Sequence, residues 1–421
     1  MRVSTLLNRL LNLQGLRVTG VLLHDGELVV TVHRRFQVLT CPCCGAKKRG
    51  RMSSRIRRWR HLGLWGRPVW IEGEIRRMRC RGCERVVTED VPWARHDSDF
   101  TKPFEEAVGL LAQKTDKTTV AKLCGIAWVT VGNIAQRLVK ELLAPTRLQG
   151  LRRLAVDEIS FRKHHRYLTV VTDHDRRQVV WVAEGKSSEV LKSFFHDLGP
   201  AACAEIEIVT MDMSAAYAKA VSEALPNAQI AYDHFHIAKL ANEALNEVRR
   251  ELVRELRPDD PAAAKAVKNL RWPTLHRLAN VPDKHLDALA NLRPDQPLGR
   301  AYLLKEDLLD ALSSSAELDR PDGRLSKWLD WASRSRLAPF VKLGRTLREH
   351  LAGIRAFLEH RVTNGLAEGV NNKIRLLSHR AFGYHSAAPL IATINLCCGG
   401  IALTELHLFL GEPKFARRRI S

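Results

Sequence analysis

Four cysteines stand in two C-x-x-C pairs, Cys41 with Cys44 and Cys80 with Cys83. Each pair fits a tight turn that presents both sulfurs on one side. Two such turns brought together offer four thiolates in a tetrahedron, the geometry that Zn²⁺ prefers, and leave no open position for catalysis. Unliganded buried thiols are the alternative. Cys43 lies inside the first pair, but the matching spacing favours Cys41 and Cys44 as ligands.

Two aspartates each end a short apolar run: Asp157 in RRLAVDEIS and Asp212 in EIEIVTMDMS. If these runs are neighbouring strands, both carboxylates lie at one edge of a sheet. There they could hold two Mg²⁺ ions, which need hard oxygen ligands and can activate water for attack on a phosphodiester. For either aspartate alone, a turn residue or a helix cap remains the ordinary alternative.

A third acidic residue, Glu368, falls in the first turn of a helix predicted to begin after Asn364-Gly365. Amides and cations follow it at helical spacing, which suggests a site that grips phosphates while one carboxylate holds metal. The alternative is a solvated glutamate that interacts favourably with the N-terminal end of the helix dipole. The residues on this helix predicted to contact DNA are Asn372, Lys373 and Arg375.

The charge of the chain is strongly positive, with 67 Lys and Arg against 46 Asp and Glu among 421 residues, a net charge of +21. Such a balance indicates a polyanionic partner, most often nucleic acid. Residues 47–60 hold eight basic residues and no acidic one, around Trp59. The residues of this stretch predicted to contact DNA are Arg55, Arg57, Arg58 and Arg60.

Residues 118–140 have the pattern of a helix-turn-helix. Thr118 or Thr119 is the expected cap of the first helix, Gly125 permits the turn, and Trp128 to Val139 form the expected recognition helix. An ordinary pair of packed helices has the same periodicity and remains the alternative. The positions of this helix predicted to reach base edges or phosphates are Thr130, Asn133, Gln136 and Arg137.

The remaining pattern indicates several domains. Residues 17–38 read as a β-hairpin with its turn at Asp25-Gly26. Residues 151–240 give three strand-like runs and then alternating helices and strands, which predicts a mixed α/β sheet. Residues 245–360 show helical spacing and no convincing strand. The fold class is therefore multidomain α+β.

The sequence offers little sign of a secretory or membrane-spanning segment. The N-terminal stretch lacks a long apolar region and a small-residue cleavage site. The uncharged run from Ser386 to Thr404 contains Pro389, Asn395 and Gly399-Gly400, so we expect a buried core helix rather than a membrane span. We therefore expect a cytoplasmic, nucleoid-associated protein with no membrane contact, where paired cysteines indicate metal rather than disulfides.

Five short motifs occur in order along the chain: VDE at 156–158, MDMSAAY at 211–217, YDHFHIAK at 232–239, TNGLAEGVNNKIR at 363–375 and RAFGY at 380–384. Together with the paired cysteines and the helix-turn-helix pattern, they resemble the bacterial insertion-sequence transposases of the DDE type, and the ISL-three family most closely. The resemblance covers residues 38 to 410, nearly the whole chain.

The resemblance implies an RNase H-like catalytic core with Asp157, Asp212 and Glu368 as its triad, interrupted by an all-helical insertion. It also implies a zinc ribbon and a helix-turn-helix that precede this core. His236 belongs to a D-x-x-H pair similar to a second signature of such enzymes, and could orient a phosphate or donate a proton. Its partner Asp233 could instead simply cap a helix.

The predicted organisation follows from these features. The five segments are an N-terminal hairpin and zinc ribbon (1–95), a helix-turn-helix (96–148), the first part of the core (149–245), an all-helical insertion (246–355) and the second part of the core with a basic tail (356–421).

The function expected from the resemblance is that of a transposase. It would bind the terminal inverted repeats of its element, double-stranded DNA, and act as a homodimer when bound to DNA. Two Mg²⁺ ions, replaceable by Mn²⁺, would support cleavage and strand transfer, and Zn²⁺ would be structural. A DNA-binding regulator with an inactive core and a structure-selective nuclease are the alternatives.

Overall fold

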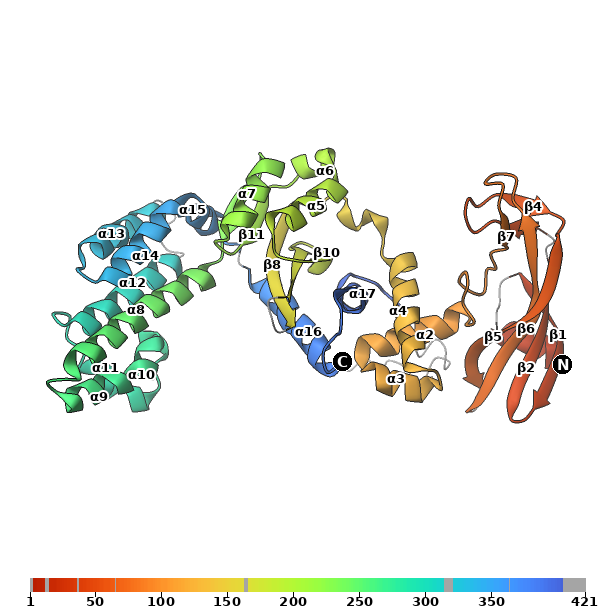
Figure 1. Ribbon diagram of the computed structural model, residues 1–421, viewed down its shortest axis with the longest axis horizontal. Helices are drawn as coiled ribbons and strands as arrows, with labels where there is room; N and C mark the ends of the chain where they lie inside the picture. Colours follow the sequence, from red (N-terminus) through yellow and green to blue (C-terminus); the bar gives the residue numbers. More distant parts are fainter. Residues whose placement is uncertain are drawn as a thin grey trace, which may run out of the picture. The chain divides into compact units, whose positions relative to one another are not determined.

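The computed structural model divides the chain into two compact units (Figure 1). One comprises the residues up to Ala144 together with those from His379 on, and the other comprises Pro145–Ser378. The residues that the structure describes are 3–11, 15–35, 38–64, 66–162, 166–313, 321–362 and 364–403. The predicted basic tail lies outside them.

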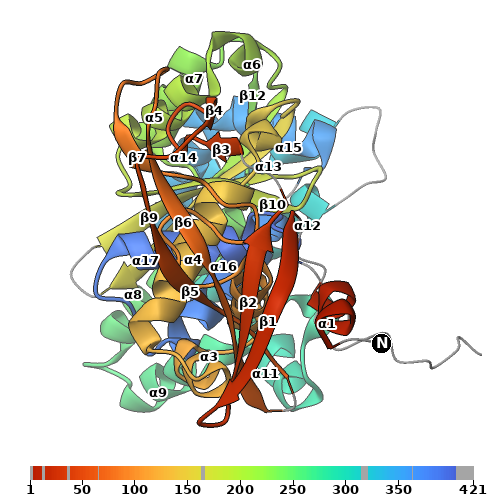
Figure 2. The same cartoon turned by 90° about the vertical axis from the view of Figure 1, so that its right-hand side faces the viewer.

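The first unit begins with a five-stranded sheet in the order β1-β2-β6-β5, with β7 paired to β6 (Figures 1 and 2). Asp25 (φ 47°) and Gly26 (φ 80°) form the two-residue turn of the predicted hairpin, and both have the positive φ that a type I′ turn requires. The elements are α1 (Val3–Leu11), β1 (Leu16–His24), β2 (Glu27–Arg34), β3 (Val38–Thr40), β4 (Lys47–Arg49), β5 (Ser53–Leu64), β6 (Arg67–Arg79) and β7 (Val86–Thr88).

Side chains that alternate along these strands build the core of the sheet, as a half-buried strand requires. On β6, Val69, Ile71 and Ile75 are buried, and on β5 the ring of Trp59 is buried and meets Trp93 edge to face at 5.5 Å. The part of the basic run from residue 53 to 60 therefore belongs to the long strand β5, and residues 47–49 form the short strand β4.

Three helices follow the sheet: α2 (Lys102–Lys114), α3 (Lys117–Cys124) and α4 (Trp128–Leu142). The axes of α3 and α4 differ by 102°, within the range of a helix-turn-helix. Gly125 ends α3 in the left-handed conformation (φ 61°), as predicted. The predicted cap was wrong: Asp116 caps α3 by accepting from the Thr119 amide, because the helix begins at Lys117, two residues earlier than a cap at Thr118 would place it.

The uncharged C-terminal run forms α17 (Ala387–Cys398), a core helix as predicted. Its Leu396 joins the apolar cluster of α2 and α4 that contains Phe104, Val131 and Ile134. Since α17 completes this cluster, the residues from His379 on group with the helix-turn-helix. The predicted segment 356–421 is thus shared between the two units.

Within the described residues, no single helix is long and apolar enough to cross a membrane, although the bent pair of α3 and α4 passes that test by length and composition alone.

A buried histidine on β5, His61, contacts the start of α2 and should make the stability of the protein depend on pH. Only 6% of the residue is exposed, and its Nδ1 lies 2.8 Å from Oγ1 of Thr101, the N-cap residue of α2. Burial lowers the pKa of His61 to about 4, against about 6.5 in an unfolded chain. Below pH 6.5 the unfolded chain takes up a proton that the folded chain excludes, so stability falls as the pH drops from 6.5 towards 4.

We expect His61→Gln to weaken this pH dependence by up to about 3 kcal/mol between pH 7 and pH 4. Thermal or denaturant unfolding of both proteins across this range measures the effect. An unchanged slope in the variant would contradict the neutral, buried state of His61.

The second unit contains the predicted mixed sheet, in the order β10-β9-β8-β11-β12. The first three strands form an antiparallel meander, and β11 and β12 run parallel to β8 and to each other. This is the topology of an RNase H-like core. Its elements are β8 (Arg153–Arg162), β9 (Arg166–Asp173), β10 (Gln178–Glu184), α5 (Ser188–Leu198), α6 (Pro200–Ala204), β11 (Ile208–Met211), α7 (Ala215–Ala224) and β12 (Gln229–Tyr232).

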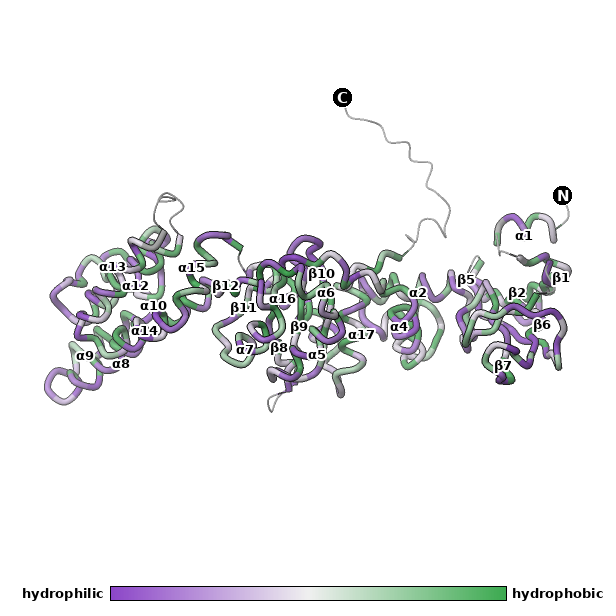
Figure 3. The backbone as a smooth tube through the Cα atoms, turned by 90° about the horizontal axis from the view of Figure 1, so that it is seen from above, coloured by the Kyte–Doolittle hydropathy of each residue, from purple (hydrophilic) through white to green (hydrophobic). Residues whose placement is uncertain are grey.

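An array of helices interrupts this core, and the described residues between 245 and 360 contain no strand, as predicted. Figure 3 shows hydrophobic and hydrophilic residues interleaved along these helices, the pattern of amphipathic helices that share a core. They are α8 (His234–Leu256), α9 (Pro261–Asn269), α10 (Arg271–Leu275), α11 (Leu286–Ala290), α12 (Pro297–Ser313), α13 (Pro321–Arg334), α14 (Ala338–Glu349) and α15 (Leu351–His360).

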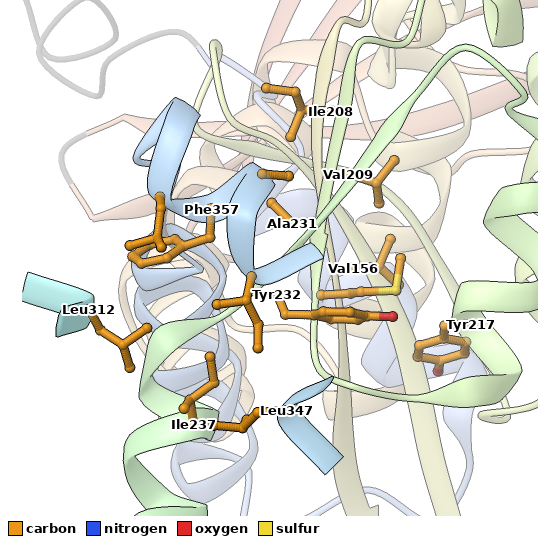
Figure 4. Packing of buried hydrophobic residues seen from close by; sticks show 14 of the residues in the cluster. Val156, Ile208, Val209, Tyr217, Ala231, Tyr232, Ile237, Leu312, Leu347 and Phe357 are labelled. Carbon is orange, nitrogen blue, oxygen red and sulfur yellow. The ribbon is translucent and has the colours of Figure 1, made fainter. Parts of the chain in front are cut away.

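The helices and the sheet share one apolar core. Figure 4 shows Tyr232 of β12, Ile237 of α8 and Leu347 of α14 among the buried side chains of this core. The backbone of α15 comes close to β12 at Gly353, where an added Cβ would lie 2.4 Å from the Tyr232 ring. This contact fixes the edge strand against the helical array, and α16 (Gly365–Arg380) then returns the chain to the sheet.

Candidate functional site

The four predicted zinc ligands come together in the first unit, and all their sulfur atoms lie within 4.8 Å of one another. Sγ of Cys41 is 3.8 Å from Sγ of Cys83, and Sγ of Cys44 is 3.4 Å from Sγ of Cys80. Cys43 is exposed and outside the cluster, so the four sulfurs that come together are those of Cys41, Cys44, Cys80 and Cys83. Four cysteine sulfurs at such spacing fit a structural Zn²⁺ ion.

The four arginines predicted to contact DNA lie on β5, but they do not share one face, because successive side chains of a strand point to opposite sides. Arg55 is exposed, and Arg57 pairs with Asp99 at 2.6 Å. On the other face, Arg58 pairs with Glu72 at 2.8 Å, and Arg60 lies over the ring of Trp70. One DNA surface cannot meet all four in this arrangement.

Asn133 and Gln136 are exposed on α4, the second helix of the helix-turn-helix, and Thr130 is half-buried. These three positions therefore remain suited to contact DNA from the recognition helix.

Arg137 lies on the same helix but serves a different contact. Its Nη2 lies 2.5 Å from Oε1 of Glu105, a carboxylate that is fully buried. Ser98 donates to the same oxygen at 2.7 Å, and Nη1 of Arg95 donates to the other oxygen at 3.1 Å. In this structure, Arg137 holds α4 against α2 and the segment that precedes it.

The second unit brings Asp157 and Asp212 to one edge of its sheet. β8 and β11 pair in parallel up to Ala155 beside Thr210. Asp157 lies two residues further along β8, and Asp212 directly follows the end of β11. Both residues line a cleft of about 390 Å³, together with Glu158, Tyr217 and His236. The predicted juxtaposition of the two aspartates is thus present in the structure.

The electrostatics of this edge are unusual for a surface. Burial, followed by the negative charge of Asp212, raises the pKa of Asp157 to about 6. His236 Nε2 lies 2.7 Å from Asp212 Oδ1, and this hydrogen bond raises the pKa of His236. Two adjacent carboxylates that repel one another in a partly desolvated cleft are a site that a cation stabilises.

Asp233 has the capping role left open by the sequence: its carboxylate accepts from the Phe235 amide and caps α8. It also lies close enough to Asp212 and His236 for one ligand atom from each to fall within 4.8 Å of the others. The three are therefore a possible metal-binding group by geometry, and the carboxylate of Glu368 is not part of it.

Glu368 is exposed in the first turn of α16 and is not among the residues that line the cleft. The contact from this helix is made by one of the amides that follow Glu368 at helical spacing, to which the sequence had assigned no role at the aspartates. Asn371, one turn after Glu368, is buried and its Nδ2 donates to Asp157 Oδ2 at 2.5 Å. The only signal in the sequence was an asparagine at helical spacing from the glutamate. Asn372, Lys373 and Arg375 are exposed.

Family models match the chain in three consecutive segments. A zinc-finger model of the transposases IS204/IS1001/IS1096/IS1165 matches residues 37–83, and a model of the helix-turn-helix domain of transposase family ISL3 matches residues 89–139. A transposase model of the same family matches residues 154–394, more than half of the chain.

Curated relatives agree with these models. The transposase for insertion sequence element IS1557 of Mycobacterium tuberculosis is 36% identical over 405 residues, covering 89% of this chain and 90% of that protein. The transposase for insertion sequence element IS1001 of Bordetella parapertussis is 31% identical over 373 residues, covering 87% and 90%. With its zinc ribbon, helix-turn-helix and RNase H-like core in the same order, the chain belongs to the ISL3 family of insertion-sequence transposases.

Proposed function

We propose that this transposase cuts and joins DNA at the ends of its own insertion sequence by the DDE mechanism, with Asp157, Asp212 and Glu368 as the catalytic carboxylates. The observation that carries the proposal is that Asp157 and Asp212, from neighbouring parallel strands, line one cleft, where the charge of Asp212 acts on Asp157. Such a pair of hard, partly desolvated oxygen donors suits divalent cations such as Mg²⁺, or Mn²⁺ in its place.

The donor set fits the proposed cations. Asp157 and Asp212 would hold them, and Glu368 would supply a further carboxylate from α16. When bound, two such ions activate a water or a 3′-hydroxyl and stabilise the leaving oxygen. Glu368 stands three residues before Asn371, about 4.5 Å along the helix axis from the residue that contacts Asp157. Its exposed side chain remains free to turn toward the same edge.

His236 would act on protons at this edge. Its Nε2 lies 2.7 Å from Asp212 Oδ1 in the described structure. Once Asp212 serves as a metal ligand, the Nε2–H would be available to a phosphate oxygen, which it could orient or protonate. His236 is therefore a proposed catalytic residue, and Asp233 keeps α8 in place beneath it.

The first unit would read the terminal inverted repeats. Asn133 and Gln136 are placed on the exposed side of α4, where amides can meet base edges in the major groove. Arg55 on β5 is an exposed cation suited to phosphates, and in the second unit Lys373 and Arg375 on α16 are two more. Because two element ends must be cut together, we propose a homodimer on DNA.

The experiment that tests this proposal is cleavage of a labelled duplex carrying an element end, with Mg²⁺, by the wild type and by Glu368→Gln. We expect a nick at the element boundary from the wild type and at least about a 10²-fold slower reaction from the variant. Equal DNA binding by the two proteins is the control. A variant that cuts as fast as the wild type would remove Glu368 from the triad, and binding without any cut by either would favour an inactive regulator.

A further inference from the structure

Two buried asparagines flank Glu368 on the chain and face the strands that carry the aspartates. Asn364 immediately precedes α16 and Asn371 lies seven residues later, so the two stand on the same side of the helix, two turns apart. Only 3% of Asn364 and 4% of Asn371 is exposed. A buried amide is unfavourable unless it is hydrogen-bonded, and asparagine is a poor helix former. The presence of a buried asparagine at each of these positions therefore calls for a structural explanation.

Asn371 contacts the first catalytic strand directly. Its Nδ2 donates to Oδ2 of Asp157, while the backbone amide of Glu158 donates to Oδ1 of the same carboxylate at 2.7 Å. Each oxygen of Asp157 thus has one donor, and two donors from different elements fix the plane of the carboxylate. Oδ1 of Asn371 is buried and has no hydrogen-bond partner in the described structure, which leaves it available to a water or cation at this edge.

Asn364 contacts the second catalytic strand. The buried hydroxyl of Thr210, two residues before Asp212 on the chain, lies 2.8 Å from His174 Nε2. With the His174 Nε2–H as donor to this hydroxyl, the hydroxyl donates to Asn364 Oδ1 at 3.2 Å, with the Leu154 carbonyl as an alternative acceptor at 3.3 Å. The Asn364 carbonyl accepts from the Glu368 amide at 2.9 Å and so begins the helix. The residue that touches β11 is therefore bonded to the backbone of the glutamate itself.

We propose that Asn364 and Asn371 are positioning residues that dock the helix carrying Glu368 onto the strands carrying Asp157 and Asp212, and that Asn371 also orients the Asp157 carboxylate. This inference rests on the proposed DDE function. Apolar packing alone would allow α16 to slide or turn on the sheet, whereas two hydrogen bonds to two strands define one position. Neither asparagine needs to touch DNA for this role.

The test compares Asn371→Ala and Asn364→Ala with Asn227→Ala, a matched control at an exposed asparagine of the same unit. Single-turnover cleavage of an element end is measured at several Mn²⁺ concentrations, beside DNA affinity and thermal midpoint. We expect Asn371→Ala to cut about 10-fold slower or more and to need more Mn²⁺ for half-maximal rate, because a hydrogen bond to a charged ligand is lost. DNA affinity should match that of the control, and the thermal midpoint should fall only by the amount that one lost buried hydrogen bond explains.

A second set of variants separates orientation from packing. Asn371→Asp keeps the shape but replaces the donor by a carboxylate at pH 8, so it should be at least as slow as Asn371→Ala. Thr210→Val removes the hydroxyl from which Asn364 Oδ1 accepts a hydrogen bond. Thr210→Val and Asn364→Ala should therefore each slow cleavage, and their effects on the rate should not add in the double variant. Additive effects of these two would overturn the Asn364 contact.

The inference fails if Asn371→Ala cuts like Asn227→Ala. It also fails if its rate, DNA affinity and thermal midpoint fall together, since that is the mark of a merely structural residue. Asp157→Asn in the same assay keeps the two proposals apart. If Asp157→Asn is inactive and Asn371→Ala is fully active, only the positioning role falls; if Asp157→Asn cuts normally, the DDE function falls with it.

Discussion

Replacing Asp212 by asparagine should slow cleavage of an element end by about 10³-fold or more while leaving DNA binding unchanged. The change keeps the size of the side chain but removes a carboxylate that shares the cleft with Asp157 and lies 2.7 Å from His236. An amide is a weaker ligand for a hard cation and carries no charge to retain it. The measurement is single-turnover cleavage at saturating protein, with Mg²⁺ and with Mn²⁺.

The same variant should change the binding of Mn²⁺ itself, which calorimetry detects without any reaction. Glu205→Gln is a suitable control because Glu205 is exposed and lies after α6, outside the cleft. If Asp212→Asn bound Mn²⁺ and cut DNA like this control, the carboxylate pair would not be the metal site. A loss of both cleavage and DNA affinity would instead indicate damage to the fold.

Replacing Cys80 by serine should release zinc and abolish sequence-specific binding of the element end. A structural Zn²⁺ contributes about 10–16 kcal/mol of apparent binding energy to small zinc domains, far more than the strands β3, β4 and β7 can supply by themselves. We expect one zinc per wild-type chain by elemental analysis, none in Cys80→Ser, and at least about a 10²-fold loss of affinity for the specific site.

Cys43→Ser is the matched control for this experiment, since Cys43 is adjacent in sequence but exposed and outside the cluster. It should retain zinc and full affinity. Residual, salt-sensitive binding by Cys80→Ser to any DNA is expected from the basic charge of the chain. Full zinc content in Cys80→Ser would show that three of these cysteines suffice or that the ligand set differs.

Local rules predicted much of the fold. Alternating apolar residues and Asp25-Gly26 define the first hairpin, because a two-residue turn with positive φ needs such residues. The cap of α3 was misplaced because Asp116 and Thr119 are both good capping residues, and the choice depends on which one reaches an amide of the first turn. The grouping of α17 with α2 and α4 was not predictable, since an apolar helix does not specify its partners.

The aspartates of the candidate site could be predicted from the sequence, whereas the side chains that contact them could not. Asp157 and Asp212 follow apolar strands, and parallel pairing of those strands brings them together. The role of Asn371 depends on how α16 rotates on the sheet, which its sequence does not determine. For the same reason, Arg137 was expected to face DNA, whereas the rotation of α4 turns it toward the buried Glu105.

Glu105 and its partners bear on the thermodynamics of DNA recognition. Because Arg95, Ser98 and Arg137 surround a fully buried carboxylate, these contacts are shielded from salt, unlike contacts with phosphates. The recognition helix is therefore held against α2 and the segment before it in free protein. The helix becomes ordered when the chain folds, so the entropic cost of ordering it does not reduce the affinity for DNA. Because the helix is already ordered, its loss of conformational entropy on binding DNA should be small at any ionic strength.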